Sequence, residues 1–312
     1  WKVDKYVDNL ENNPQVVDAA HFLQENEVVA LPTETVYGLG GNAESDEAVE
    51  KIFASKGRPS DNPLIIHIGD KMQLNAFVTE IPQIAETLME RFWPGPLTII
   101  FNKKPGVLSE KATAGLNTVA VRMPDHPVAL ALLQVCQLPI AAPSANSSGK
   151  PSPTNAQHVI EDLNGKIAGV LDGGSTGVGV ESTVLDCTEE IPIILRPGGV
   201  TKEQLEAVVG EVQLDAALLD EASKPKAPGM KYQHYAPNAP LYLVNGSQSY
   251  LQSLIEEKQK EGLTVGVLAT EESVESYKCD VAIACGKRAE LETVATALYE
   301  TLRAFNQEKV DI

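Results

Sequence analysis

Short apolar segments alternate with helix-patterned segments along most of the chain, and this alternation restricts the possible folds more than any other feature. Glu27–Leu31 and Leu97–Phe101 have the pattern of buried strands, whereas Pro14–Glu25 and Gln248–Gly262 carry apolar residues at helical spacing. Strands that alternate with helices indicate an α/β fold. The other expected strands are Leu64–Ile68, Thr118–Met123, Leu138–Ala142, Gly169–Asp172, Ser182–Cys187, Pro192–Leu195, Leu241–Val244, Thr264–Ala269 and Val281–Cys285.

A Pro-rich stretch at 224–240 interrupts this alternation. A segment of this length without a helix or strand pattern is either a linker or a functional loop. Its prolines lower the entropy lost on ordering, and its aromatic residues offer stacking faces, so we expect it to lie down on a surface. We therefore divide the chain into a large unit at 1–210, a linker or lid at 211–240, and a smaller parallel α/β unit at 241–312 that ends where another strand would begin.

The charge and the cysteines exclude several classes of protein. The net charge of −18 argues against a nucleic-acid binder, which would need a basic surface. An anion can still bind where cations converge locally. No apolar run approaches the length of a membrane span. The four cysteines form no Cys-x-x-Cys pair, which fits a reducing compartment and gives no sign of a zinc site.

A basic turn precedes the predicted strand Leu64–Ile68. Gly57 permits backbone angles that other residues avoid, and Pro59 biases Arg58 away from helix. Lys56 and Arg58 therefore lie on a tight turn at the start of a strand. Two fixed cations in this position suit a polyanion such as a triphosphate, whereas a solvated basic turn is the plainer interpretation.

Other loops have a similar build. Arg122 lies at the end of a predicted strand, and Arg196 precedes the rigid turn Pro197–Gly199. Hydroxyl side chains lie on loops or at strand starts, at Thr35, Thr118, Ser144, Ser152 and Ser182. In an open α/β sheet such loops gather at one edge. A single arginine is most often a surface charge, but four cations on small-residue loops of an acidic chain favour one anion-binding cleft.

The common catalytic motifs are incomplete. The spacing Gly38-x-Gly40-x-x-Ala43 resembles a dinucleotide fingerprint, yet a tight strand-to-helix turn explains these glycines equally well. Gly174–Gly179 has the glycine spacing of a phosphate loop but lacks the Lys-Ser/Thr that must follow it. Ser144 and its neighbouring serines have no histidine nearby in the sequence, so a hydrolase triad has no local support.

Five motifs in order carry a resemblance to a known family. They are Pro32–Leu39 (PTETVYGL), Lys56–Pro59 (KGRP), Ser144–Asn146 (SAN), Glu181–Val184 (ESTV) and Leu195–Gly198 (LRPG). Together they resemble the YrdC-type threonylcarbamoyl-AMP synthases, and Ala227–Pro237 looks like the linker of the two-domain branch. The resemblance implies a large catalytic domain with a twisted mixed sheet and helices, plus a smaller Rossmann-like parallel C-terminal domain that continues past Ile312.

The resemblance also implies a reaction and its ligands. L-threonine, bicarbonate and ATP with Mg2+ would give pyrophosphate and threonylcarbamoyl-AMP, which serves the threonylcarbamoyladenosine modification of tRNA. The residues that would hold threonine are Thr35, His67, Arg122, Ala142 and Ser182. The residues that would hold ATP are Lys56, Arg58, Asn62, Thr118, Ser144, Ser152, Arg196 and Tyr235, of which Lys56 and Arg58 would be catalytic. No residue is assigned to the metal.

The same resemblance implies where the protein acts and which proteins receive its product. We expect a cytoplasmic enzyme whose product is received by tRNA threonylcarbamoyl-transferase proteins, without direct binding to tRNA or membranes. Because a carbamate oxygen can attack the α-phosphorus without a protein nucleophile, catalysis would consist of positioning and charge stabilisation. The linker would fold over the cleft as a lid, with Tyr235 touching the nucleotide.

Two alternatives stay open. A carbamoyl-adenylate-forming enzyme of hydrogenase maturation carries the same domain, but among zinc-finger and acylphosphatase modules, and the four cysteines argue against those modules here. A non-enzymatic RNA-binding module would need a strongly basic cleft in a chain whose net charge is −18.

Overall fold

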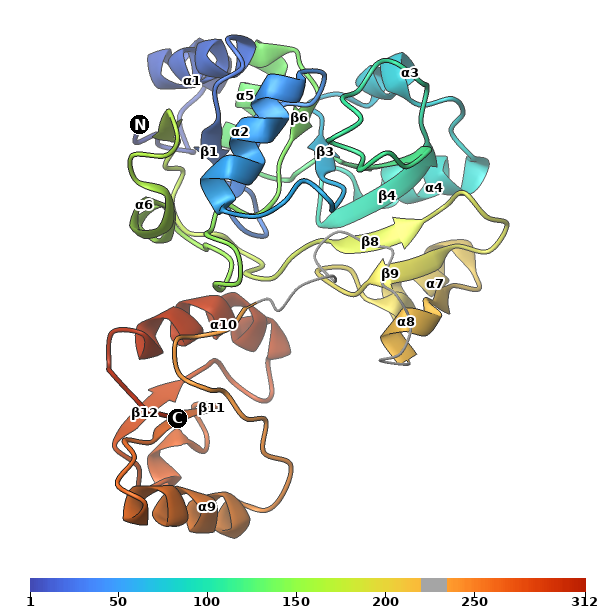
Figure 1. Ribbon diagram of the computed structural model, residues 1–312. Coiled ribbons are helices and arrows are strands. Elements are labelled where there is room, and N and C mark those ends of the chain that lie inside the picture. Colours follow the sequence, from blue (N-terminus) through green and yellow to red (C-terminus); the bar gives the residue numbers. More distant parts are fainter. Residues whose placement is uncertain (220–234) are drawn as a thin grey trace.

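The computed structural model describes residues 1–219 and 235–312, and the N-terminal part is built on one ten-stranded mixed sheet (Figure 1). Its strands are β1 (Val29–Leu31), β2 (Gly38–Asn42), β3 (Ile65–His67), β4 (Leu97–Asn102), β5 (Thr118–Arg122), β6 (Ile140–Ala141), β7 (Gly169–Val170), β8 (Thr183–Asp186), β9 (Ile193–Arg196) and β10 (Gln213–Leu214). Their order across the sheet is β10-β9-β8-β4-β5-β3-β6-β2-β1-β7. Neighbouring strands pair in both directions: β3 runs parallel to β5, whereas β4 runs antiparallel to it.

Helices connect and cover these strands. They are α1 (Pro14–Gln24), α2 (Asp46–Lys56), α3 (Leu74–Phe77), α4 (Gln83–Phe92), α5 (Pro127–Cys136), α6 (Ala156–Leu163), α7 (Lys202–Val209) and α8 (Ala216–Leu219), with single 3-10 turns at Leu10–Asn12 and Lys71–Gln73. Several begin at the residue that the sequence offers as a cap. The side chains of Ser45 and Thr201, for example, accept hydrogen bonds from the backbone N–H groups of Ala48 and Gln204.

The two faces of the sheet are covered differently. On one face, Val29 and Leu31 of β1 and Ile140 of β6 pack with residues of α1 and α5. His67 lies opposite Ile140 in the β3–β6 pair, so it belongs to the same face. Further along this face, over β3, β4, β5, β8 and β9, only a small apolar cluster is buried, made of Ile65, Ile100, Ala120, Val184 and Leu195. This half of the face is therefore available for a site.

The C-terminal part is a smaller α/β unit. Two parallel strands, β11 (Gly266–Ala269) and β12 (Val281–Ala284), lie between α9 (Gln248–Lys260) and α10 (Leu291–Phe305), with a 3-10 turn at Val274–Ser276. Figure 1 shows α10 on the side that faces the N-terminal part, next to the loops around α6 and β8. The predicted fold class, a large mixed sheet with a smaller parallel α/β unit, is confirmed.

One predicted loop is a strand. Residues 38–42, expected within a glycine-rich loop, form β2 between β1 and β6. The glycines favoured the prediction of a turn, but in the structure they allow neighbouring elements to pack closely. A Cβ on Gly40 would lie 2.8 Å from Leu31 Cδ2 and 3.0 Å from Ile140 Cγ2. The strand-to-helix turn and the dinucleotide fingerprint considered for this segment are both wrong.

The structure differs from the prediction on both sides of the Pro-rich stretch. Leu241–Val244 forms no strand, and within the described ranges no other segment pairs with it, so Leu241, Tyr242 and Leu243 are exposed. The large sheet continues beyond Gly210, because β10 pairs with β9. The proposed boundaries at 210 and 240 stay predictions.

Across both described ranges, no helix combines the length and the apolar character that crossing a membrane requires.

Candidate functional site

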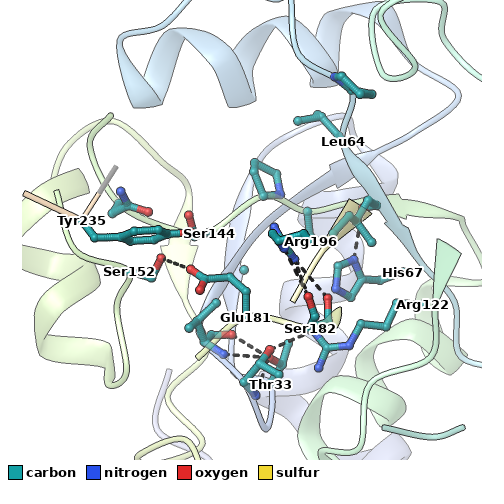
Figure 2. A pocket seen from close by; sticks show the side chains of 18 of the residues that line it. Thr33, Leu64, His67, Arg122, Ser144, Ser152, Glu181, Ser182, Arg196 and Tyr235 are labelled. Atoms are coloured by element: carbon teal, nitrogen blue, oxygen red, sulfur yellow. Dashed lines mark hydrogen bonds between the residues drawn. The ribbon is translucent and has the colours of Figure 1, made fainter. Parts of the chain in front are cut away.

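A cavity lies on the half of the sheet that the helices leave open, where loops from several strands meet (Figure 2). The predicted residues that line it are Thr35, Arg58, His67, Arg122, Ala142, Ser144, Ser152, Ser182, Arg196 and Tyr235. The other lining residues are Thr33, Val36, Gly38, Pro63, Leu64, Ile65, Pro143, Asn146, Lys150 and Glu181. The structure thus brings three of the four singled-out cations to one cavity, together with all five residues predicted for threonine.

Arg122, at the end of β5, has two hydrogen-bond partners and one ion-pair partner. Its Nη1 donates to Thr35 Oγ1 at 2.8 Å, and its Nε donates to the Gly95 carbonyl at 3.2 Å. Its Nη2 lies 2.6 Å from Glu34 Oε1, and both side chains of this ion pair are largely buried. A buried arginine with these partners presents a positive charge in one orientation, which suits recognition of a carboxylate.

His67 lies beside Arg122, because the two residues are register partners in the β3–β5 pair. Burial, followed by the positive charge of Arg122, lowers the pKa of His67 to about 3. The Nδ1 atom lies 3.2 Å from the Ile65 carbonyl. A neutral ring that donates from Nδ1 to this carbonyl keeps Nε2 as an acceptor for a ligand hydroxyl or amine.

Ser182, just before β8, and Arg196, at the end of β9, lie close to Arg122 and His67 in the cavity (Figure 2). Arg196 Nη2 donates to the Ser182 carbonyl at 2.9 Å and to Ser182 Oγ at 3.3 Å. Ser182 Oγ also lies 2.7 Å from Thr98 Oγ1 of β4. These bonds hold a second arginine at the cavity (Figure 2).

The basic turn has the conformation that the sequence predicts. Gly57 ends α2 with a positive φ of 67°, and the N–H of Arg58 bonds back to the Phe53 carbonyl. The guanidinium of Arg58 lies over the Phe53 ring, 5.5 Å from its centroid. The turn therefore directs Arg58 to the cavity.

Lys56 lies behind the cavity wall and is absent from the lining. Its Nζ donates to the carbonyls of Ser144 and Asn146, the latter at 2.8 Å. Burial lowers the pKa of Lys56 well below its ordinary value, and the charge of Arg58 adds to this effect. In this arrangement Lys56 holds the loop that carries Ser144.

Two other predicted ATP residues are also outside the lining. Asn62 is buried, and its Nδ2 has no hydrogen-bond partner among the described residues. Thr118 shares a face of β5 with Arg122 but lies four residues before it, about 13 Å along a strand. Whether Lys56, Asn62 and Thr118 contact a ligand stays a prediction.

Glu181 is a cavity residue to which the sequence assigned no role. Its Oε1 accepts from Ser152 Oγ at 2.5 Å, and its Oε2 accepts from the hydroxyl of Tyr299 at 2.6 Å. Lys150 was likewise missed, and its Nζ donates to Asp162 Oδ1 at 2.9 Å. Two signals in the sequence could have identified these residues. Glu181 is a carboxylate in a loop rich in glycine, and Lys150 is a cation close to the SAN motif.

The fold and the cavity define the class of the protein, an α/β protein with a ligand site lined by arginines and hydroxyl side chains. Residues 21–198 match the model of the Sua5–YciO–YrdC family, which carries the description "Telomere recombination". Residues 200–312 match "Threonylcarbamoyl-AMP synthase, C-terminal domain". The chain belongs to the threonylcarbamoyl-AMP synthase family, in the branch that has this C-terminal domain.

Known relatives agree with this assignment. The threonylcarbamoyl-AMP synthase of Bacillus subtilis (strain 168) is 59% identical over 311 residues, which cover 100% of this chain and 90% of that protein. The crystal structure of P. abyssi Sua5 complexed with L-threonine has a TM-score of 0.89 and 47% identity, and covers 95% of this chain and 87% of that one. Full-length HypF, with a TM-score of 0.52 and 22% identity over 58% of this chain and 28% of its own, shares the fold alone.

Proposed function

We propose that this protein is a threonylcarbamoyl-AMP synthase, which forms threonylcarbamoyl-AMP and pyrophosphate from L-threonine, bicarbonate and ATP for the modification of tRNA. The observation that carries the proposal is the full-length relationship to the curated synthase of Bacillus subtilis. The cavity agrees with it, because three arginines that line one cavity suit a substrate with a carboxylate together with one that has a triphosphate.

Threonine binds on the side of Arg122 and His67. The hydrogen bond from Arg122 to Thr35 and the ion pair with Glu34 fix the guanidinium before the ligand arrives, so little side-chain entropy is lost on binding the carboxylate. The neutral His67 serves the hydroxyl or amine of the ligand without adding charge. Ala142 leaves room for the methyl group. A crystal structure of P. abyssi Sua5 with L-threonine supports this choice of substrate.

ATP binds on the side of Arg58 and Arg196, whose guanidinium groups suit the phosphates. Ser144 and Ser152 supply hydroxyls, and Tyr235 supplies a ring at the rim. Mg2+ enters as part of the ATP substrate, held by phosphate oxygens and water. This fits the donor set, since within the described ranges no three His, Cys, Asp or Glu residues group into a metal site.

The reaction needs positioning more than covalent catalysis. Bicarbonate gives CO2 and hydroxide, and the neutral amine of threonine adds to the carbon of CO2 as one C=O π bond opens. The proton lost from nitrogen combines with the hydroxide to form water, which leaves a carbamate. A carbamate oxygen then attacks the α-phosphorus, the bond to the bridging oxygen of the β-phosphate breaks, and pyrophosphate leaves with that electron pair. Arg58 and Arg196 stabilise the charge that develops on the phosphates, while Arg122 holds threonine in line.

The alternatives have weaker support. HypF resembles this chain only at the level of the fold, so the carbamoyl-adenylate reaction of hydrogenase maturation gains nothing specific from it. An RNA-binding module remains at odds with the net charge of −18.

The setting of the enzyme is part of the proposal. A cytoplasmic location and transfer of the product to tRNA threonylcarbamoyl-transferase proteins follow from the need to deliver a reactive anhydride to tRNA. Residues 220–234, half of the proposed linker or lid at 211–240, lie outside the described residues, and the lid stays a prediction. Tyr235, at its end, does line the cavity.

Omission of one substrate at a time tests the proposal. Purified full chain with ATP and Mg2+ is expected to release pyrophosphate only when both L-threonine and bicarbonate are present. Serine in place of threonine lacks only a methyl group, so discrimination of about tenfold to two-hundredfold is expected. Equal turnover without threonine contradicts the proposal, and turnover that requires carbamoyl phosphate instead supports the hydrogenase-maturation alternative.

A further inference from the structure

The C-terminal helix α10 reaches the wall of the cavity through Tyr299. This side chain is 4% exposed and packs with Leu302 and with Val36 of the N-terminal part. Its hydroxyl donates to Glu181 Oε2 at 2.6 Å. Val36 and Glu181 both line the cavity. A residue of the C-terminal part therefore touches the site that the N-terminal part builds, without lining it.

The carboxylate of Glu181 has a defined orientation because each oxygen has its own donor. Ser152 Oγ donates to Oε1 at 2.5 Å, and the hydroxyl of Tyr299 donates to Oε2 at 2.6 Å. Figure 2 shows the bond between Glu181 and Ser152, close to Tyr235 at the rim. Charge-assisted bonds of this kind are short and directional. Without the hydroxyl of Tyr299, Oε2 loses this donor, and the orientation of the carboxylate then depends on Ser152 and on its interaction with Tyr235.

Tyr299 also supports Tyr235. Their rings are stacked, with centroids 5.0 Å apart and planes inclined by 20°. Tyr235 has a positive φ of 63°, which a non-glycine residue rarely adopts and which its surroundings must hold. Burial raises the pKa of Tyr235 to about 12 and that of Tyr299 still further, so both hydroxyls remain protonated near neutrality.

A buried ion pair fixes α10 against the same wall. Arg303 Nη2 donates to Asp162 Oδ2 at 2.9 Å and to the carbonyl of Pro151 at 2.6 Å. About two turns earlier in α10, Thr296 Oγ1 donates to the Gly177 carbonyl at 2.9 Å. Pro151 precedes Ser152 in the chain, so the helix holds both the backbone beside Ser152 and the carboxylate to which Ser152 bonds.

We propose that Tyr299 is a positioning residue of the nucleotide side of the site, acting through the orientation of Glu181 and the placement of Tyr235. The inference rests on the proposed function, because it assigns Ser152 and Tyr235 to ATP and Arg122 to threonine. Through Tyr299, the C-terminal part thus contributes to the nucleotide side of the site.

The test is the conservative variant Tyr299→Phe, which keeps the stacked ring and removes the hydroxyl. Loss of one hydrogen bond to a charged group is expected to raise the KM for ATP and the calorimetric Kd of ATP by about fivefold to fiftyfold. The KM for threonine is expected to stay within about twofold, which separates positioning from general loss of structure. Tyr250→Phe, an exposed tyrosine of α9, is the matched control and is expected to behave as wild type.

A double-variant cycle tests the route through the carboxylate. If Tyr299 acts through Glu181, the double variant Tyr299→Phe/Glu181→Gln is expected to bind ATP no more weakly than the weaker single variant. Additive losses, wild-type ATP affinity in Tyr299→Phe, or equal losses for ATP and threonine with a large drop in Tm each overturn the proposal. Wild-type protein without threonine-dependent pyrophosphate release contradicts the proposed function instead, and the ATP titrations then still decide the role of Tyr299.

Discussion

The substitution Arg122→Lys keeps the positive charge but removes the planar guanidinium, which can offer two parallel donors. Arg122 makes three contacts, to Thr35 Oγ1, to the Gly95 carbonyl and to the Glu34 carboxylate. A lysine can keep the ion pair with Glu34 but cannot offer two parallel donors to a ligand carboxylate. Losing one charge-assisted contact costs about 1.5–3 kcal/mol, which corresponds to a rise of about tenfold to a hundredfold in the Kd of threonine.

Lysine is a better test here than alanine. Arg122→Ala would leave the Glu34 carboxylate, only 12% exposed, without its partner, at a cost of about 3–5 kcal/mol to folding. Calorimetric titration of Arg122→Lys with threonine and with ATP is the assay, and Arg288→Lys on the exposed surface of the C-terminal part is the matched control. Wild-type threonine affinity in Arg122→Lys, or an equal loss for ATP, would refute the assignment of the carboxylate.

Three further predictions follow from the site and the sheet. Arg58→Ala should raise the Kd of ATP by about tenfold to a hundredfold in calorimetry and leave threonine binding nearly unchanged. Arg196→Ala should weaken the binding of both ligands, because Arg196 also donates to the carbonyl and the hydroxyl of Ser182. A loss of threonine affinity without a loss of ATP affinity in Arg58→Ala would contradict the assignment of the two sides. Gly40→Ala should lower the free energy of unfolding by about 1–3 kcal/mol in urea titrations, because the new Cβ would lie 2.8 Å from Leu31 Cδ2. The pKa of His67 is lowered to about 3, so the unfolded chain binds the extra proton below about 6.5. Stability should therefore rise with pH from about 3 to about 6.5, and His67→Gln should reduce that slope; an unchanged slope would show that His67 is not the neutral group described.

Local geometry was predictable where a few adjacent residues decide it. The turn at Gly57 follows from its own conformational freedom and from the end of α2, and the structure shows the expected left-handed angle. The residues of the SAN and ESTV motifs were predicted to meet at one edge, and Ser144 and Ser182 both line the cavity.

Contacts between distant segments were not predictable in this way. The Nζ of Lys56 bonds to the carbonyls of Ser144 and Asn146, and these partners depend on where a loop some ninety residues later folds back. Glu181 gains its importance from Tyr299, which belongs to the other α/β unit. Pattern and spacing contain no information about such pairs.

The strand β2 was predicted to be a loop because contacts between distant segments were not considered there either. A run such as Gly38–Asn42 has low strand propensity, and propensity describes an isolated strand better than a central one. In the sheet, β2 is flanked by β1 and β6 and lies close to α2, so small residues are needed to let these neighbours approach. Packing between elements outweighed local preference.

The fate of the bicarbonate carbon tests the central claim most directly. Full-length protein is incubated with ATP, Mg2+, L-threonine and 13C-bicarbonate, and the adenylate product is analysed by mass spectrometry. We predict a single adenylate that contains threonine and carries the 13C label, formed together with pyrophosphate. An unlabelled threonyl-adenylate, a labelled product without threonine, or no adenylate at all would contradict the assignment.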